Sequence, residues 1–151
     1  MIAVGSRLMK DDGIGLLIAE ELEKRFLRSE LEIIYGETDS ETCFYSLSPN
    51  DFILIIDATS FGDRPGSVKI FSLEEIMERI SNPTMQHDMS FIDMIRVYRF
   101  PVRGYLIGVE AAIIAPGLEL STVLKRQFPL ICRKIEDIIR EILSKEAKKD
   151  N

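Results

Sequence analysis

The chain has 151 residues, 46% hydrophobic and 29% charged, which predicts one folded domain large enough to bury a core. Its net charge of -6 argues against nucleic acid as a partner, because phosphates require a basic protein face. The sequence has no apolar run of about 18 residues and no signal-peptide pattern at its start. We therefore expect a cytoplasmic protein with no membrane partner.

The first part of the chain alternates strand-like and helix-like segments. Asp11 stands at the position of a helix N-cap, and Asp12 falls in the first helical turn, where the helix dipole favours anions. A continuous apolar run at 52–57 ends in Asp57, which is typical of a central parallel strand buried on both faces. The expected elements are strands at 1–5, 31–35 and 52–57 and helices at 12–28 and 41–47.

The second part continues the alternation and closes on a long amphipathic helix. The short strand at 67–71 is expected at the edge of the sheet, and residues 83–88 are expected to form a loop. The remaining expected elements are a strand at 105–109 and helices at 73–80, 91–98 and 122–144. We divide the chain into one domain, residues 1–144, and a flexible C-terminal tail, residues 145–151.

This order of elements predicts an α/β fold: a single-domain, three-layer structure with a mostly parallel twisted sheet of about five strands and helices on both faces. Ligands of such folds gather at the carboxyl ends of the strands. Asp12 follows the first strand, Asp57 ends the third, and His87 lies in a loop before a helix. Two carboxylates and one imidazole at one sheet edge would form an incomplete shell for a divalent metal.

Each of these three residues also has a structural interpretation. Adjacent acids before a helix often serve as a cap, and an Asp after a strand often closes a turn. A lone histidine is often an ordinary surface residue, and because His87 is the only one, a multi-histidine metal site is excluded. Cys43 and Cys132 lie outside any ligand spacing and are expected to be reduced thiols. Spacing alone leaves the metal site and the structural interpretation both open.

Four motifs occur in order over nearly the whole chain. They are Gly5-Ser6-Arg7-Leu8-Met9-Lys10-Asp11-Asp12-Gly13-Ile14-Gly15, Ile55-Ile56-Asp57-Ala58 followed by Pro65-Gly66-Ser67-Val68, His87-Asp88-Met89-Ser90-Phe91-Ile92-Asp93-Met94, and Ile107-Gly108-Val109-Glu110 followed by Leu118-Glu119-Leu120-Ser121. In this order the sequence resembles the hydrogenase maturation endopeptidase family, the proteases that trim the C-terminus of nickel–iron hydrogenase large subunits.

The resemblance implies a specific site and substrate. Asp12, Asp57 and His87 match the positions at which family members bind a divalent metal, and they are the expected catalytic and metal-binding residues. The metal would be the nickel already loaded into the large-subunit precursor, which the enzyme senses before it releases a C-terminal peptide. We expect no tightly held cofactor, weak binding of zinc or cadmium as surrogates, and a monomer whose partner is the precursor.

The sequence departs from the family pattern at two places. Ser6 replaces the asparagine that follows the first glycine, and residues 36–40, Gly-Glu-Thr-Asp-Ser, replace a Gly-Gly-Thr-x-Gly loop. The second change adds the acids Glu37 and Asp39 near the expected site, which bears on the large subunit that is recognised. Two alternative functions stay open: a non-catalytic binder of the large subunit, and another small carboxylate–metal hydrolase.

Overall fold

Five strands form one sheet in the order β2-β1-β3-β5-β4 in the computed structural model, which describes residues 1–79 and 90–149. The strands are β1 (Ile2–Val4), β2 (Ile34–Glu37), β3 (Phe52–Thr59), β4 (Val68–Ser72) and β5 (Arg103–Glu110). The helices are α1 (Ile14–Glu23), α2 (Ser40–Tyr45), α3 (Leu73–Arg79), α4 (Phe91–Val97) and α5 (Thr122–Lys149), with a 3-10 turn, η1 (Lys10–Gly13), before α1.

The pairing of the strands places the chain reversal beside β1. Strands β2, β1, β3 and β5 are parallel, and β4 pairs antiparallel with β5 at the edge of the sheet. The chain leaves β1 through η1 and α1 to reach β2 on one side, while β3 pairs with the other side of β1. The carboxyl ends of β1 and β3 therefore border the crevice where the strand order reverses.

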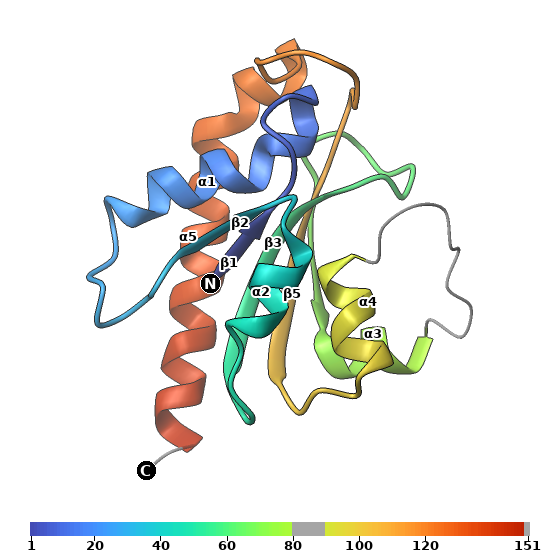
Figure 1. Ribbon diagram of the computed structural model, residues 1–151. Coiled ribbons are helices and arrows are strands. Elements are labelled where there is room, and N and C mark those ends of the chain that lie inside the picture. Colours follow the sequence, from blue (N-terminus) through green and yellow to red (C-terminus); the bar gives the residue numbers. More distant parts are fainter. Residues whose placement is uncertain (80–89, 150–151) are drawn as a thin grey trace.

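Alternate residues of β3 point into two different cores. Ile53 and Ile55 belong to the core that α2, α3 and α4 cover, whereas Leu54 and Ile56 belong to the core under α1 and α5. Figure 1 shows these two helical layers on opposite sides of the sheet. An uninterrupted apolar run suits a strand that is buried on both faces. The three-layer α/β fold with five strands is thus confirmed.

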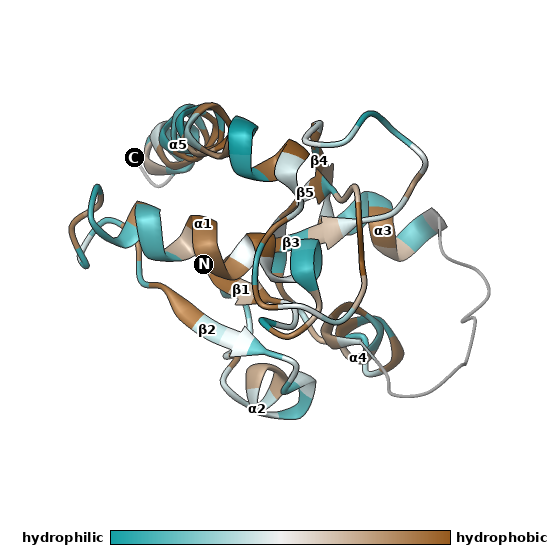
Figure 2. Cartoon of the chain, turned by 90° about the horizontal axis from the view of Figure 1, so that it is seen from above, coloured by the Kyte–Doolittle hydropathy of each residue, from teal (hydrophilic) through white to brown (hydrophobic). Residues whose placement is uncertain are grey.

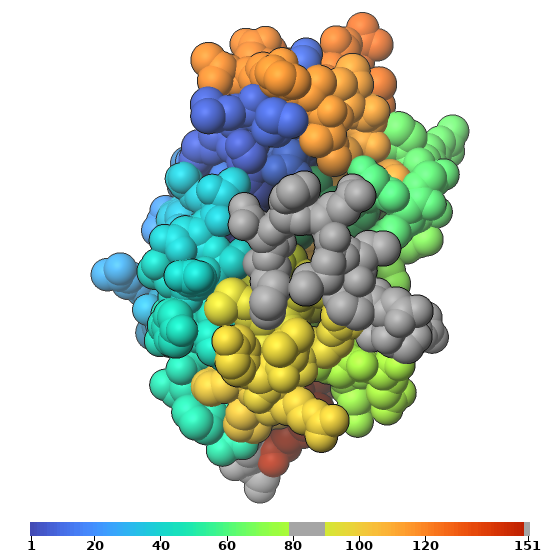
Figure 3. Space-filling view, turned by 45° about the vertical axis from the view of Figure 1, so that its right-hand side comes forward, coloured from blue at the N-terminus to red at the C-terminus, as the bar shows by residue number. Residues whose placement is uncertain are grey.

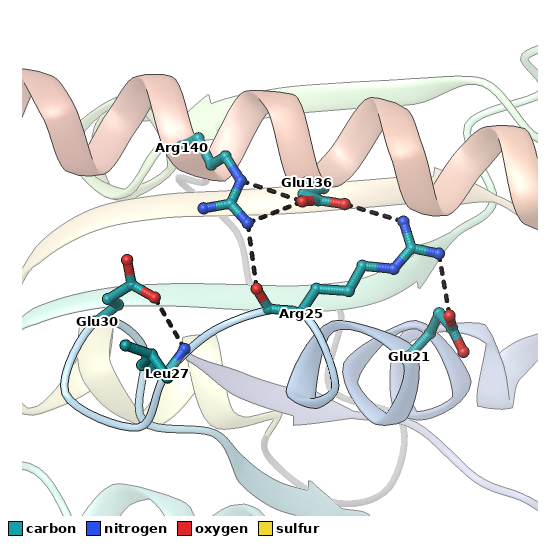
Figure 4. A network of polar contacts seen from close by, with 6 residues as sticks. All are labelled: Glu21, Arg25, Leu27, Glu30, Glu136 and Arg140. Carbon is teal, nitrogen blue, oxygen red and sulfur yellow. Dashed lines mark hydrogen bonds and ion pairs between the residues drawn. The ribbon is translucent and has the colours of Figure 1, made fainter.

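Two helices of one layer are joined by a network of ion pairs (Figure 4). Arg25, just after α1, contacts Glu21 at 3.0 Å and Glu136 of α5 at 2.9 Å. Arg140 contacts the same Glu136 at 2.9 Å and donates a hydrogen bond to the Arg25 carbonyl oxygen. These paired charges join α5 to the carboxyl end of α1.

Several element boundaries differ from those expected. Helix α1 spans Ile14–Glu23 rather than 12–28, because the chain turns after it, with Leu27 donating its backbone N–H to the Glu30 carboxylate at 2.8 Å. Strand β2 begins at Ile34 rather than at residue 31. Helix α5 continues to Lys149, so residues 145–149 are helical rather than a frayed tail; the division into domains stays a prediction.

The helical end of α5 is supported by ion pairs of its own. Lys145 contacts Glu141 at 2.6 Å one turn away, and Lys149 contacts Glu146 at 2.7 Å, while Arg103 of β5 pairs with Glu146. Such pairs stabilise a helix modestly. Over residues 1–79 and 90–149, no helix combines the length and the apolar character needed to cross a membrane.

Candidate active site

A pocket of about 210 Å³ opens at the carboxyl edge of the sheet, beside the ends of β1 and β3. Its polar lining comes from Asp12, Glu37, Ser40, Asp57 and Ser90, and its apolar lining includes Ile55, Phe91 and Ile92. The segments after β1, around α2 and at α4 gather on this face of the molecule (Figure 3). The reversal of strand order at this edge is where α/β folds usually bind ligands.

Asp12 reaches the pocket because the chain folds back sharply after β1. Its Oδ2 accepts a hydrogen bond from the backbone N–H of Ser6 at 2.8 Å. Gly5 makes this turn with φ +130°, and a Cβ at that position would lie 2.0 Å from the carbonyl oxygen of Asp12. A side chain is excluded there both by the backbone conformation and by the close approach. The first glycine of the opening motif therefore places the acid.

Asp57 enters the same pocket from β3, which continues two residues beyond it to Thr59. Its Oδ1 accepts a hydrogen bond from the N–H of Ala58 at 2.8 Å. Burial raises the pKa of the Asp57 carboxyl from 3.8 to about 7, with the negative charge of Asp12 adding to the rise and the Ala58 hydrogen bond opposing it. A cation in the pocket would offset the repulsion between the two acids and favour their ionised forms.

Asp11 is not the N-cap that the sequence predicts. The N-cap of α1 is Gly13, without a side-chain hydrogen bond. Asp11 is buried, and its carboxylate accepts the backbone N–H groups of Ala112, Ile113 and Ser121 at 2.7–2.9 Å. Burial opposes ionisation, but these hydrogen bonds outweigh it and lower the pKa of Asp11. Asp11 thus fixes the segment that leads from β5 to α5.

Glu110 anchors a second loop at the same edge, a role that the sequence analysis missed. Its buried carboxylate accepts the Thr59 hydroxyl at 2.8 Å and the N–H groups of Phe61 and Gly62 at 3.1 and 2.9 Å. Burial again opposes ionisation, and the hydrogen bonds lower the pKa of Glu110. An acid that ends a buried strand was the available signal, because such a charge requires partners.

Comparison with known proteins identifies the family. The sequence profile described as "Hydrogenase maturation protease" matches residues 16–138. The chain belongs to the hydrogenase maturation protease family. It is 27% identical, over 95% of its own length and 87% of the relative's, to the hydrogenase 2 maturation protease of Escherichia coli strain K12.

Two solved structures of relatives agree with this membership. The hydrogenase maturating endopeptidase HybD from E. coli aligns with 93% of this chain and 91% of its own, with a TM-score of 0.72 and 25% identity. A nickel–iron hydrogenase maturation protease HybD from Thermococcus kodakarensis aligns with 91% and 97%, with a TM-score of 0.65 and 28% identity. The expected family, fold and enzyme class, a hydrogenase maturation protease, are confirmed.

Residues 36–40, which depart from the pattern expected for hydrogenase maturation proteases, place their two acids in different surroundings. Glu37 lines the pocket in a left-handed conformation, φ +50°, and its carboxylate contacts Arg7 at 3.2 Å. Asp39 instead caps α2, accepting the N–H and the hydroxyl of Thr42 at 3.0 and 2.7 Å. Of the two added acids, Glu37 therefore lines the site and Asp39 starts a helix.

The structure brings together two of the three predicted site residues of this hydrogenase maturation protease. Asp12 and Asp57 line one pocket, whereas His87 lies outside the described residues. Over the two described ranges, no group of three or more His, Cys, Asp or Glu side chains is arranged to hold a metal ion. Binding of a metal by Asp12, Asp57 and His87 stays a prediction. Ser40 and Ser90 also line the pocket, and the Ser90 hydroxyl donates to the Asp93 carboxylate at 2.7 Å.

Proposed function

We propose that this protein senses nickel in the precursor of a nickel–iron hydrogenase large subunit and then removes the precursor's C-terminal peptide. One observation carries the proposal: Asp12 and Asp57 line one open pocket at the reversal of strand order. Membership of the hydrogenase maturation protease family supplies the class of substrate. Nickel in this proposal belongs to the substrate and is not a resident cofactor.

The donor set of the pocket fits a divalent cation. Both carboxylates line this partly buried space, where burial chiefly, and the negative charge of Asp12 in addition, raises the pKa of Asp57, so a cation between them would offset both effects. With His87, the chain would offer two oxygen ligands and one nitrogen ligand, and thiolates of the precursor would complete the shell. Asp12, Asp57 and His87 would therefore position the nickel and, with it, the peptide bond to be cut.

Hydrolysis adds one water across the peptide bond: the water oxygen joins the carbonyl carbon, and the released nitrogen gains a proton. Nickel held by the precursor would polarise that carbonyl. Because burial raises the pKa of Asp57 to about 7 in the free protein, a metal that binds there would displace a proton from part of the molecules near neutral pH. We propose that the protein carries no tightly held cofactor, binds zinc or cadmium weakly, and acts as a cytoplasmic monomer.

The test compares nickel-loaded and nickel-free precursor as substrates for the purified protein, with the product mass as readout. We expect trimming of the loaded precursor alone and none of an unrelated unfolded protein such as casein. Trimming of the nickel-free precursor would overturn nickel sensing. Tight binding of the loaded precursor without cleavage would favour a non-catalytic binder. Hydrolysis of small substrates without any hydrogenase would favour another carboxylate–metal hydrolase.

A further inference from the structure

Four large apolar side chains stand in solvent at the carboxyl edge of the sheet. Leu8 and Leu118 are 65% and 80% exposed, and Ile113 and Ile114 are 46% and 45% exposed. We call these four residues the apolar platform. They come from the segment after β1 and from the segment between β5 and α5, which Figure 2 shows passing over the edge of the sheet as seen from above.

Backbone hydrogen bonds join the two segments of the platform. Gly117 donates its N–H to the carbonyl oxygen of Leu8 at 2.9 Å, and Lys10 donates to the carbonyl oxygen of Gly117 at 3.0 Å. Asp11 donates to the carbonyl oxygen of Ile113 at 3.2 Å. The segment that carries Leu8 is therefore hydrogen-bonded to the segment that carries Ile113 and Leu118.

A buried charge anchors the backbone that carries three of the four platform residues. The Asp11 carboxylate accepts the N–H groups of Ala112, Ile113 and Ser121, which bracket most of the segment. Burying a carboxylate is costly unless such hydrogen bonds compensate for its lost hydration. The buried Asp11 carboxylate thus anchors a loop whose large apolar side chains are exposed to solvent. A preformed apolar surface loses little conformational freedom when a partner covers it.

The platform and the candidate active site share one stretch of chain at the carboxyl edge of the sheet. Asp11, which holds the platform, is followed directly by Asp12, which lines the pocket. The Asp12 carboxylate accepts the N–H of Ser6, two residues before Leu8. A partner that inserts a chain segment into the pocket would therefore approach the same edge of the sheet that carries the platform.

We propose that the apolar platform is the docking surface for the folded body of the hydrogenase large-subunit precursor. This inference rests on the proposed function. The pocket, about 210 Å³, has room for only a few residues of a substrate, so most of the recognition of a folded protein must lie outside it. A second copy of this chain is the alternative occupant, and the oligomeric state of the free chain tests it.

The experiment replaces the platform's most exposed residues with polar ones. Leu8→Ser, Leu118→Ser and the double variant are compared with Leu27→Ser, a control that is 68% exposed in the turn after α1 (Figure 4). Exposed substitutions of this kind change stability little, which thermal unfolding of each variant verifies. The readouts are KM and kcat for the nickel-loaded precursor, and the Kd for that precursor with all variants built on Asp57→Asn.

We expect KM and Kd to rise about 10-fold in each single variant and further in the double variant, with kcat unchanged, because truncation of central interface residues weakens binding. Leu27→Ser should behave as its parent. Unchanged KM and Kd in the double variant would overturn the proposal, and so would a dimer of the free chain that Leu118→Ser dissociates. Platform-dependent binding by a parent protein that cuts nothing would support the docking surface and refute the protease function.

Discussion

Two pairs of acids lie at one edge of the sheet and behave in opposite ways. The anchoring pair, Asp11 and Glu110, is buried, and each carboxylate accepts at least three hydrogen bonds. The pocket pair, Asp12 and Asp57, lines an open pocket, and within the described ranges each carboxylate accepts one hydrogen bond from a backbone N–H. The number of donors around a carboxylate, rather than its burial alone, separates an acid that stabilises the fold from one that is available for chemistry.

The pKa values follow the same division. Hydrogen bonds lower the pKa of Asp11 and Glu110 despite their burial, whereas burial with little compensation raises the pKa of Asp57 to about 7. The anchoring acids thus remain charged at neutral pH and hold two loops in place. Asp57 is only partly ionised there, and a cation would complete its ionisation. Substitutions at Asp57, Asp11, His87 and Glu37 would test this division, with the largest effect expected at Asp57.

Asp57→Asn should reduce processing of the nickel-loaded precursor by about 100-fold or more, because the pocket loses one of its carboxylates. The same change should make the free protein more stable at pH 8. The folded-state pKa of about 7 lies above the ordinary 3.8, so the stability of the parent protein falls as pH rises from about 4 to 7. The gain in the free energy of unfolding should be on the order of 2 kcal/mol.

Product mass and urea unfolding at pH 5 and pH 8 measure these two effects. The variant should lack the loss of stability that the parent shows between the two pH values. A variant with full activity and unchanged stability would contradict the role of Asp57 in the site.

Asp11→Asn should have the opposite signature. An amide retains one acceptor oxygen, and its NH₂ group would face backbone donors, so the free energy of unfolding should fall by about 3 kcal/mol. The lowered pKa of Asp11 means that its contribution is present above about pH 4 in the parent and is lost as pH falls through that lowered value. Urea unfolding at pH 7 and pH 3 measures the difference, which should shrink at pH 3. Equal stability of parent and variant at pH 7 would contradict the anchoring role.

His87→Gln tests whether His87, which lies outside the described ranges, binds a metal together with Asp12 and Asp57. Metal binding requires a neutral imidazole, with an ordinary pKa of roughly 6.5, and an ionised Asp57. Zinc affinity of the parent should therefore fall by up to about 100-fold per pH unit in acid, since two protons compete with the metal. The variant should show about a 10-fold fall, because one proton remains. Calorimetric titration between pH 5.5 and 7.5 measures both slopes, and identical slopes would reject His87 as a ligand.

Glu37→Gly should have the smallest effect. Glycine removes the strain of the left-handed backbone conformation, which costs other residues about 1 kcal/mol. It also raises the conformational entropy of the unfolded chain, which opposes that gain in stability. The lost ion pair with Arg7 is half-exposed and contributes little. The free energy of unfolding should thus change by no more than about 1 kcal/mol. Glu37→Gln keeps the backbone strain and removes only the charge. If the free energy of unfolding changes more in Glu37→Gly than in Glu37→Gln, the difference comes from the backbone.

The order and type of the elements could be read from the sequence, because apolar periodicity reports which faces of a segment are buried. The run at 52–57 predicted a central strand, and the Ile53 and Ile55 side chains do lie on the face opposite to Leu54 and Ile56. The ends of the elements were less predictable. Helix α1 stops at Glu23 and α5 continues to Lys149, because local turns and ion pairs, which leave little trace in periodicity, decide where a helix ends.

The sequence by itself determined the family, the three-layer α/β fold and the two acids, Asp12 and Asp57, that share the pocket. Only the tertiary structure decided the roles of the neighbouring acids. Asp11 and Asp12 are adjacent in sequence, yet one anchors a loop a hundred residues away and the other faces the site. The physical reason is that the state of a carboxylate depends on which hydrogen-bond donors surround it, and distant parts of the chain bring those donors together.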